Sequence, residues 1–216
     1  MNNPLVDEDG FRSKDLSDYL DVSRETFDKI NIVVEVLDKW RKTHNLIGPL
    51  ERNRLWRRHI LDSLQVYQYR SDNASKWIDL GSGAGFPALI MACASGNAEE
   101  KYTLVESNGK KCAFLRAAAR AANLNISVEN SRIESVSRET YDHVTSRALA
   151  SLPQLYDYSE RFLANKASCI FLKGKEVLQE IEIAQSDWEF DYELHESFSH
   201  TEGRILVVKG LNRRNK

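Results

Sequence analysis

The chain has 216 residues, 42% of them apolar, which is enough for the core of one domain with an appendage. Its formal net charge of −2 excludes a uniformly basic nucleic-acid-binding protein, so an RNA-binding surface would have to be a local patch. No apolar run is long enough to span a membrane, and the acidic N-terminus predicts no secretion signal. The three cysteines are scattered without metal-type spacing, which predicts reduced core thiols in a cytoplasmic protein.

The first third of the chain is predicted to be helical. Apolar residues recur at helical spacing over 21–44, and a second helix is expected over 52–69. Between them, 45–49 is expected to be a turn, because its Gly-Pro pair does not continue a helix. We therefore expect a helical extension over 1–70 and a main domain over 71–216 within one compact unit.

After a loop at 71–75, predicted strands and helices alternate. The expected strands are one ending at Asp79, then 101–106, 125–129, 141–147 and 167–173, followed by a strand-like pair at 188–198 and 204–209. The expected helices are 87–95, 108–123, 132–138, 151–165 and 174–184, and 212–216 is expected to be a frayed tail. This alternation predicts an α/β fold with a mostly parallel sheet and helices on both faces.

A glycine-rich turn follows the first strand. Gly81, Gly83 and Gly85 stand at alternate positions and allow the backbone to approach a ligand closely. The next helix then points its free N–H groups at that ligand. Twenty-one residues after Gly85, at the end of the next strand, stands Glu106, which suits the hydroxyls of a ribose. The segment is predicted to bind a nucleoside-containing cofactor.

The spacing favours S-adenosylmethionine over a dinucleotide. A dinucleotide fingerprint is G-x-G-x-x-G, whereas this turn is G-x-G-x-G and is preceded by Asp79. A carboxylate there repels a pyrophosphate but attracts an ammonium or sulfonium group. An NAD-dependent oxidoreductase and a plain structural turn remain alternatives.

The carboxyl ends of the other predicted strands carry polar residues, and open α/β sheets bind ligands at that edge. They include Asn108, Asn130, Arg132, Glu134, Arg147, Lys173 and Lys175. Several of these segments together resemble one family, the bacterial 16S rRNA guanine-N7 methyltransferases known as the RsmG or GidB family. The resemblance covers about residues 20–210 and is carried by Arg58-His59-Ile60-Leu61-Asp62-Ser63-Leu64, by Asp79 to Pro87, by Glu106 to Leu115, by Val144 to Ala148 and by Leu172-Lys173-Gly174.

The resemblance implies a class I methyltransferase with a Rossmann-like, seven-stranded sheet. It also implies S-adenosylmethionine as cofactor, S-adenosylhomocysteine as product, and N7 of a guanine in 16S rRNA as the methyl acceptor. The small ribosomal subunit or an assembly intermediate would be the partner of a cytoplasmic protein, expected to be a monomer without membrane contact. A small-molecule methyltransferase and a non-catalytic module that binds S-adenosylmethionine remain alternatives.

The expected cofactor contacts come partly from the resemblance and partly from the residues. Asp79 is expected at the methionine part and Glu106 at the ribose, although each can instead be a helix cap. The glycine turn adds Gly83 and Gly85, and the resemblance implies contacts at Gly81, Phe86, Ile133, Glu134 and Arg147. Arg147, at a strand tip, is also the candidate catalytic residue. It can hold cofactor, base or phosphate, or form a structural salt bridge.

A local RNA footprint is expected from basic residues around the site, although solvated helix faces are the default reading of such charges. The candidates are Arg57, Arg58, His59, Lys110, Lys111, Lys173 and Lys175. His59 and Asp62 are three residues apart and can pair with each other or with the cleft. No metal site is expected from them, and His143 is expected to be a packed core residue. Guanine N7 carries a lone pair and no proton, so its methylation needs positioning rather than a general base.

Overall fold

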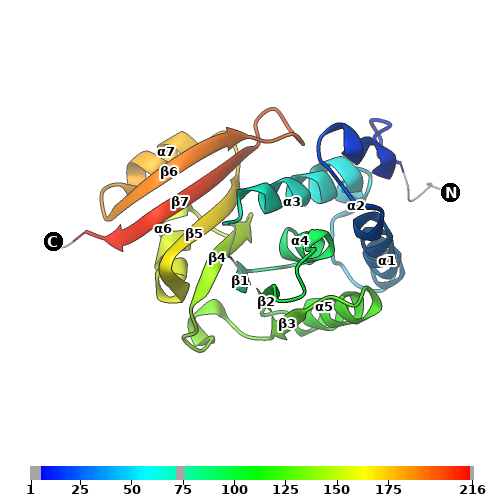
Figure 1. The fold of residues 1–216 in the computed structure, drawn as a ribbon, viewed down its shortest axis with the longest axis horizontal. Helices are drawn as coiled ribbons and strands as arrows, with labels where there is room; N and C mark the ends of the chain where they lie inside the picture. The colour runs from blue at the N-terminus through cyan, green and yellow to red at the C-terminus, as the bar shows by residue number, and fades with distance from the viewer. Residues whose placement is uncertain (1–5, 72–75, 215–216) are drawn as a thin grey trace.

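The computed structural model describes residues 6–71 and 76–214, and its centre is a seven-stranded sheet (Figure 1). The strand order is β3-β2-β1-β4-β5-β7-β6, with β1 to β5 parallel and β7 antiparallel to both of its neighbours. The strands are β1 Lys76–Leu80, β2 Lys101–Val105, β3 Ile126–Glu129, β4 Tyr141–Arg147, β5 Leu163–Lys173, β6 Trp188–Glu196 and β7 Arg204–Arg213. The predicted mostly parallel, seven-stranded sheet is confirmed. Most of the loop expected at 71–75 lies outside the described residues.

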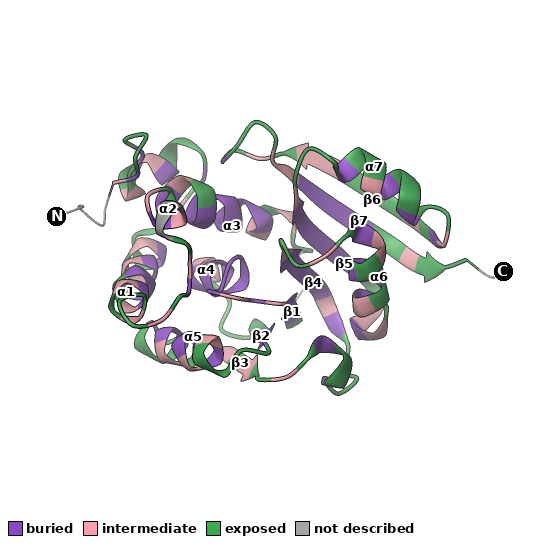
Figure 2. Ribbon diagram, turned by 180° about the vertical axis from the view of Figure 1, so that it is seen from behind, coloured by how far each residue is buried: buried purple, intermediate pink, exposed green. Residues whose placement is uncertain are grey.

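Helices cover both faces of this sheet, as predicted (Figures 1 and 2). They are α1 Arg24–Trp40, α2 Pro49–Arg52, α3 Asp62–Leu64, α4 Ala88–Ala94, α5 Gly109–Ala121, α6 Leu152–Ser159 and α7 Val177–Ala184. The strand residues alternate between the two layers: Trp77 belongs to the apolar cluster of α1, α4 and α5, whereas Ile78 and Leu80 belong to that of α6 and α7. This is the period-two pattern of a strand buried on both faces. No helix in the described part of the chain is long and apolar enough to cross a membrane.

The N-terminal helices share their core with the sheet. Helix α1 packs against α4 and α5, and its fully buried Ile30 and Leu37 lie in one apolar cluster with Phe114 of α5 and Val207 of β7. Burial of these side chains stabilises the extension and the sheet together, at about 25 cal/mol for each Å² of apolar surface.

The prediction of one regular helix over 52–69 is wrong, because this segment contains several short helices of different types. Helix α2 begins at Pro49, where a proline fits because the first helical N–H needs no partner. A π-helix then spans Leu55–Leu61, and α3 and a 3-10 helix at Gln65–Tyr69 follow. The Asp7 carboxylate accepts hydrogen bonds from the N–H groups of Trp56 at 3.0 Å and Arg57 at 2.8 Å. A carboxylate from a distant segment therefore fixes the start of the π-helix, which apolar periodicity does not reveal.

Three other predicted boundaries are wrong. Helix α6 ends at Ser159 rather than at 165, and β5 already begins at Leu163 because that residue pairs with Tyr141 of β4. The helix expected over 132–138 is a 3-10 turn at Ile133–Ser135. The expected frayed tail over 212–216 is partly strand, since β7 continues to Arg213 beside β6, and 215–216 lie outside the described residues.

Candidate active site

The glycine turn lies at the carboxyl end of β1 and has the left-handed backbone that favours glycine. Gly81, Gly83 and Gly85 have φ angles of +70°, +57° and +89°. The Ser82 N–H donates to the carbonyl of Val105 at 3.0 Å, and the Gly85 N–H donates to the carbonyl of Ser82 at 2.7 Å. The turn is therefore tied to the end of β2 and folded tightly on itself.

The three glycines have different surroundings. A Cβ at Gly81 would lie 2.7 Å from Leu149 Cδ1, and one at Gly85 would lie 2.7 Å from Leu89. A Cβ at Gly83 would meet nothing nearer than the Gly81 carbonyl oxygen at 3.8 Å. Gly85 is thus required by packing against Leu89 Cβ, whereas a Cβ at Gly81 would displace only the end of the partly exposed Leu149 side chain. Gly83 faces open space, as expected for a backbone that a cofactor approaches.

Asp79 has one bonded and one unbonded carboxylate oxygen. Its side chain is only 1% exposed, and its Oδ1 accepts a hydrogen bond from Thr145 Oγ1 at 2.7 Å. Its Oδ2 has no hydrogen-bond partner within residues 6–71 and 76–214. Burial raises the pKa of this carboxyl from 3.8 to about 6. A positively charged group beside Oδ2 would satisfy it, so the residue fits the ammonium or sulfonium group of S-adenosylmethionine.

Glu106 holds the glycine turn and does not cap α5. Its Oε2 accepts a hydrogen bond from the Gly83 N–H at 2.9 Å, and its Oε1 accepts one from the Asn108 N–H at 2.7 Å. The cap of α5 is Asn108, whose Oδ1 accepts from the N–H groups of Lys110 and Lys111. Each Glu106 oxygen retains a lone pair for a further donor, which is what a ribose hydroxyl requires.

Ile133 and Glu134 follow β3 on the short 3-10 turn. Ile133 is buried in the same apolar cluster as Leu80 and Val105, the last residues of β1 and β2. The Glu134 side chain is exposed, and its carbonyl accepts a hydrogen bond from Arg161 Nη1 at 2.9 Å. The pair thus lies near the strand ends with one apolar and one solvent-facing side chain.

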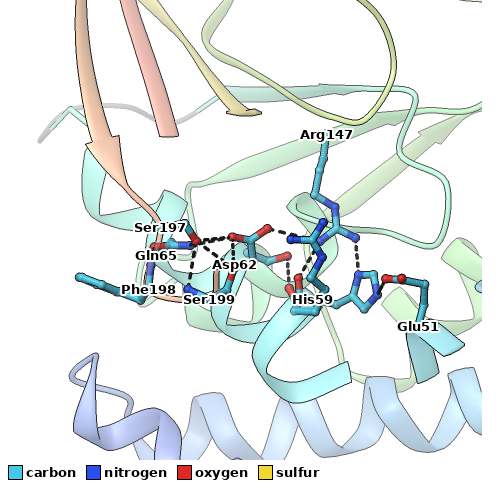
Figure 3. Close-up of polar contacts among 10 residues, drawn as sticks. Glu51, His59, Asp62, Gln65, Arg147, Ser197, Phe198 and Ser199 are labelled. Carbon is cyan, nitrogen blue, oxygen red and sulfur yellow. Dashed lines mark hydrogen bonds and ion pairs between the residues drawn. The ribbon is translucent and has the colours of Figure 1, made fainter. Parts of the chain in front are cut away.

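Arg147 ends β4 with its guanidinium enclosed by side chains (Figure 3). The side chain is 18% exposed, and burial lowers its pKa while the Asp62 carboxylate acts in the opposite direction. Its Nη1 donates to the carbonyl of Arg58 at 3.2 Å, and its Nη2 donates to His59 Nδ1. Its Cζ lies 5.2 Å from the centre of the Phe86 ring, a cation–π contact. Arg147 is thereby linked to the glycine turn through Phe86.

His59 is a neutral support for Arg147. Burial lowers the pKa of His59 to about 3, and the positive charges of Arg147 and Arg58 act in the same direction. Because Nδ1 accepts a hydrogen bond from a guanidinium, the ring proton is on Nε2, which lies 2.8 Å from Glu51 Oε2. The ring centre is 4.9 Å from that of Phe86. A neutral, buried imidazole supplies no positive charge to an RNA phosphate.

A cavity of about 520 Å³ lies beside Arg147. It is lined by Glu51, Arg58, His59, Asp62, Arg147, Ala148, Leu172, Lys173, Gly174, Lys175, Glu180, His200, Glu202, Gly203 and Arg204. The structure therefore brings together five of the predicted site residues: Arg58, His59, Arg147, Lys173 and Lys175. Lys173 is neutralised by Glu180, whose Oε2 is 2.6 Å from its Nζ. Arg58, Lys175 and Arg204 have no carboxylate partner in the described part of the chain.

Three predicted RNA contacts lie outside this cavity. Arg57 is held by the N-terminal segment, with its Nε 2.8 Å from Asp9 Oδ2 and its guanidinium 4.3 Å from the centre of the Phe11 ring. Lys110 and Lys111 begin α5 and do not line the cavity.

The sequence analysis missed the loop between β6 and β7, which supplies His200, Glu202 and Gly203 to the cavity, together with Arg204 at the start of β7. An available signal was the antiparallel orientation of the last strand. Such a strand starts at the edge where its parallel neighbours end, and Arg204 indeed pairs with Lys173.

His143 is a core residue, as predicted, with Nδ1 2.7 Å from Ser168 Oγ and its ring 4.2 Å from that of Trp77. Within the described residues no cluster of three or more His, Cys, Asp or Glu side chains is suited to hold a metal ion.

Comparison with solved structures shows the class I methyltransferase fold. An O-methyltransferase from Bacillus cereus in complex with SAH superposes with a TM-score of 0.56 at 15% identity, covering 91% of this chain and 96% of that one. A ribosomal protein L11 methylase from Lactobacillus delbrueckii subsp. bulgaricus gives a TM-score of 0.57 at 14% identity, with coverages of 78% and 81%.

Sequence comparison identifies the family of this chain. A chain from Hyphomonas neptunium named ribosomal RNA small subunit methyltransferase G is 44% identical over 195 residues, covering 90% of this chain and 93% of the relative. The protein of the same name from Rhizobium meliloti is 42% identical over 203 residues, with coverages of 91% and 95%. A sequence model of this family also matches residues 26–210. The chain belongs to the rRNA small subunit methyltransferase G family.

Proposed function

We propose that this protein transfers a methyl group from S-adenosylmethionine to N7 of a guanine in the 16S rRNA of the small ribosomal subunit. The observation that carries the proposal is the glycine turn, which combines open space at Gly83 with the unpaired oxygen of Asp79. This turn stands beside a cavity with cations on its rim, in a chain of this family. The protein would act in the cytoplasm as a monomer, on the small ribosomal subunit or on an assembly intermediate of it.

The cofactor would be held by groups that the chain already orients. Asp79 would pair with the positive charge of the methionine part, and Glu106 would accept hydrogen bonds from the ribose hydroxyls. Ile133 would contact the adenine through its apolar side chain, with Glu134 at the polar edge. When bound, S-adenosylmethionine supplies a methyl group on a positively charged sulfur.

The chain's own part in the reaction is positioning. Guanine N7 offers a lone pair and releases no proton, so no side chain has to act as a base. Arg147 is the candidate for holding the base or the cofactor, because it is the cation that links the glycine turn to the cavity. Its flat guanidinium can stack on a base or donate to guanine O6, while Arg58, His59 and Phe86 restrict its movement.

The RNA backbone would be bound by the cavity rim. Arg58, Lys175 and Arg204 are cations without carboxylate partners in the described chain, so phosphates can neutralise them without breaking an ion pair. Lys110 and Lys111 would extend this footprint along the start of α5. A local patch of this kind is compatible with the net charge of −2.

The decisive experiment is transfer of labelled methyl from S-adenosylmethionine to undermethylated small ribosomal subunits, followed by nucleoside analysis of the 16S rRNA. We expect labelled 7-methylguanosine. Absence of label from RNA, with S-adenosylmethionine still bound in calorimetry, would contradict the proposal. That result would favour a small-molecule acceptor or a non-catalytic module. Binding of NAD in place of S-adenosylmethionine would contradict the cofactor assignment.

A further inference from the structure

Asp62 connects two parts of the site, and neither the cofactor nor the RNA assignments give it a role. Its Oδ1 accepts hydrogen bonds from Gln65 Nε2 at 2.8 Å, Ser197 Oγ at 2.8 Å and Ser199 Oγ at 2.7 Å (Figure 3). Its Oδ2 lies 3.7 Å from Arg147 Nη1. The residue is 8% exposed, so this carboxylate is shared between the β6–β7 loop and Arg147 with little water around it.

The β6–β7 loop, residues 197–203, is tied to the Asp62 region by the side chains of Gln65, Ser197 and Ser199, whose hydrogen-bond donors are all engaged. The Gln65 amide donates to both Asp62 Oδ1 and Ser197 Oγ, and its Oε1 accepts from the Phe198 N–H at 2.9 Å. Ser197 Oγ also accepts from the Ser199 N–H at 3.0 Å. Each hydroxyl has one proton and lies within donating distance of Asp62 Oδ1, and the two hydroxyl oxygens are 2.9 Å apart. This consistent set of donors and acceptors fixes the loop on that oxygen.

The other half of the same loop lines the cavity. The Ser197 N–H donates to the Gly203 carbonyl at 3.1 Å, and a Cβ at Gly203 would lie 2.8 Å from Ser197 Cβ, so the two ends of the loop are in close contact. Arg204 follows at once, and among the residues that the structure describes its Nη1 donates to the carbonyls of Thr201 and Gly203, each at 2.8 Å, and to no carboxylate. The Arg204 guanidinium therefore keeps its charge available for an anion at the cavity.

We propose that Asp62 is a positioning residue that couples the β6–β7 loop, where RNA would dock, to the Arg147 guanidinium. The inference rests on the proposed function in that it takes RNA as the occupant of the cavity. A carboxylate suits this place because one oxygen accepts three donors while the other faces a cation. An amide at position 62 would keep the Oδ1 acceptor but turn an NH₂ donor toward the guanidinium, leaving a buried charge without its counter-charge. Binding energy between RNA and the loop then helps to hold Arg147 in place.

Two variants test separately the ion pair between Asp62 and Arg147 and the hydrogen bonds between Asp62 and the β6–β7 loop. Asp62→Asn removes the charge beside Arg147 and keeps the acceptor for the loop. Ser197→Ala combined with Ser199→Ala removes the two hydroxyls that donate to Asp62 and keeps the carboxylate beside Arg147. Ser186→Ala is the control, since the exposed Ser186 hydroxyl donates to the Ile183 carbonyl at 2.8 Å and Ser186 does not line the cavity.

Turnover on undermethylated small subunits is the first readout. We expect Asp62→Asn to lower kcat about tenfold or more, and the double serine variant to lower it about threefold or more. In both variants the Kd for S-adenosylmethionine should stay within about twofold of the wild-type value, because Asp79, Gly83 and Glu106 are unchanged and the inference takes Arg147 as the group that holds the acceptor base. Wild-type kcat in either variant would overturn the inference, as would a kcat loss matched by an equal loss of cofactor affinity.

A second readout does not depend on activity. Nitrogen NMR of the Arg147 side chain reports how freely its guanidinium turns, and amide exchange reports the order of the loop. The double serine variant should speed exchange at Phe198 and Ser199 and also free the Arg147 guanidinium; an unchanged Arg147 signal would overturn the coupling. If the wild-type protein methylates no subunit RNA, the proposed function fails. The NMR result still decides whether Asp62 couples the loop to Arg147.

Discussion

The buried Asp79 carboxylate is destabilising when no cation accompanies it, and this gives it a measurable pH signature. Burial raises the pKa of Asp79 from 3.8 to about 6. Between these two pH values the folded protein therefore keeps a proton on Asp79 that the unfolded chain has already released. The free energy of unfolding therefore falls as pH rises from about 4 to about 6 and levels off above. A rise of about two pKa units lowers the free energy of unfolding by at most about 3 kcal/mol.

Asp79→Asn should abolish the fall in the free energy of unfolding between about pH 4 and pH 6 and should weaken cofactor binding. Asn keeps the acceptor for Thr145 Oγ1 and carries no charge at any pH. We expect the variant to be about 1 to 3 kcal/mol more stable than wild type at neutral pH, with no such gain near pH 4. Urea denaturation at both pH values measures the stability, and calorimetry measures affinity for S-adenosylmethionine. Undiminished affinity would show that the carboxylate does not contact the cofactor's positive charge.

Gly83 allows a second test at the scale of single residues, with a control elsewhere in the chain. Gly83 and Gly10 both have positive φ, at +57° and +84°, and neither has an atom within 3.4 Å of a built Cβ. Alanine at either place should lower the free energy of unfolding by about 1 kcal/mol through backbone strain alone. Only Gly83→Ala should also weaken S-adenosylmethionine binding, measured by calorimetry. Equal affinities in the two variants would mean that the cofactor does not pass over Gly83.

The π-helix Leu55–Leu61 depends on a distant partner, because the Asp7 carboxylate accepts hydrogen bonds from the N–H groups of Trp56 and Arg57 near its start. Asp7→Ala should therefore lower the free energy of unfolding by about 1 to 2 kcal/mol, the usual effect of losing a helix cap. Glu8→Ala is the control, since Glu8 forms an exposed ion pair with Arg54 that water and salt screen, so its removal should change the free energy of unfolding less than removal of Asp7 does. Thermal and urea denaturation measure both. Equal losses in the two variants would contradict the capping role of Asp7.

The strands and the longer helices could be predicted because their signals are local. Strands β1 and β2 contain adjacent apolar residues, Trp77-Ile78 and Leu104-Val105, next to turn signals, and α1 and α5 repeat apolar residues at helical spacing. The errors share a different cause. The π-helix depends on Asp7, and the early start of β5 on pairing of Leu163 with Tyr141. Such contacts join segments far apart in the sequence, so no local pattern records them.

In the whole molecule, the site residues that could be predicted follow from local signals, and those that were missed depend on contacts between distant segments. Arg58, Arg147, Lys173 and Lys175 were predicted, the last three because parallel strands end at one edge, and all four line the cavity. The anchoring of the β6–β7 loop on Asp62 was not predicted, since its hydrogen bonds join residues up to 137 positions apart. Asp62 itself stood in a recognised motif, but only the fold shows which charges it faces.

The shared core predicts that the N-terminal helices and the sheet unfold together. Leu37 of α1 is fully buried in one cluster with Ile170 and Val207 of the sheet, while Trp188 reports on the cluster across the sheet. Leu37→Ala should lower the free energy of unfolding by about 2 to 5 kcal/mol. It should shift equally the transitions seen by far-UV circular dichroism and by the resolved fluorine NMR signal of Trp188 in protein labelled with fluorotryptophan. The exposed Leu178 of α7 provides the control, whose change to Ala should cost about 0.5 kcal/mol or less. A separate early transition in the Leu37 variant would instead mean that residues 1–70 fold as an independent unit.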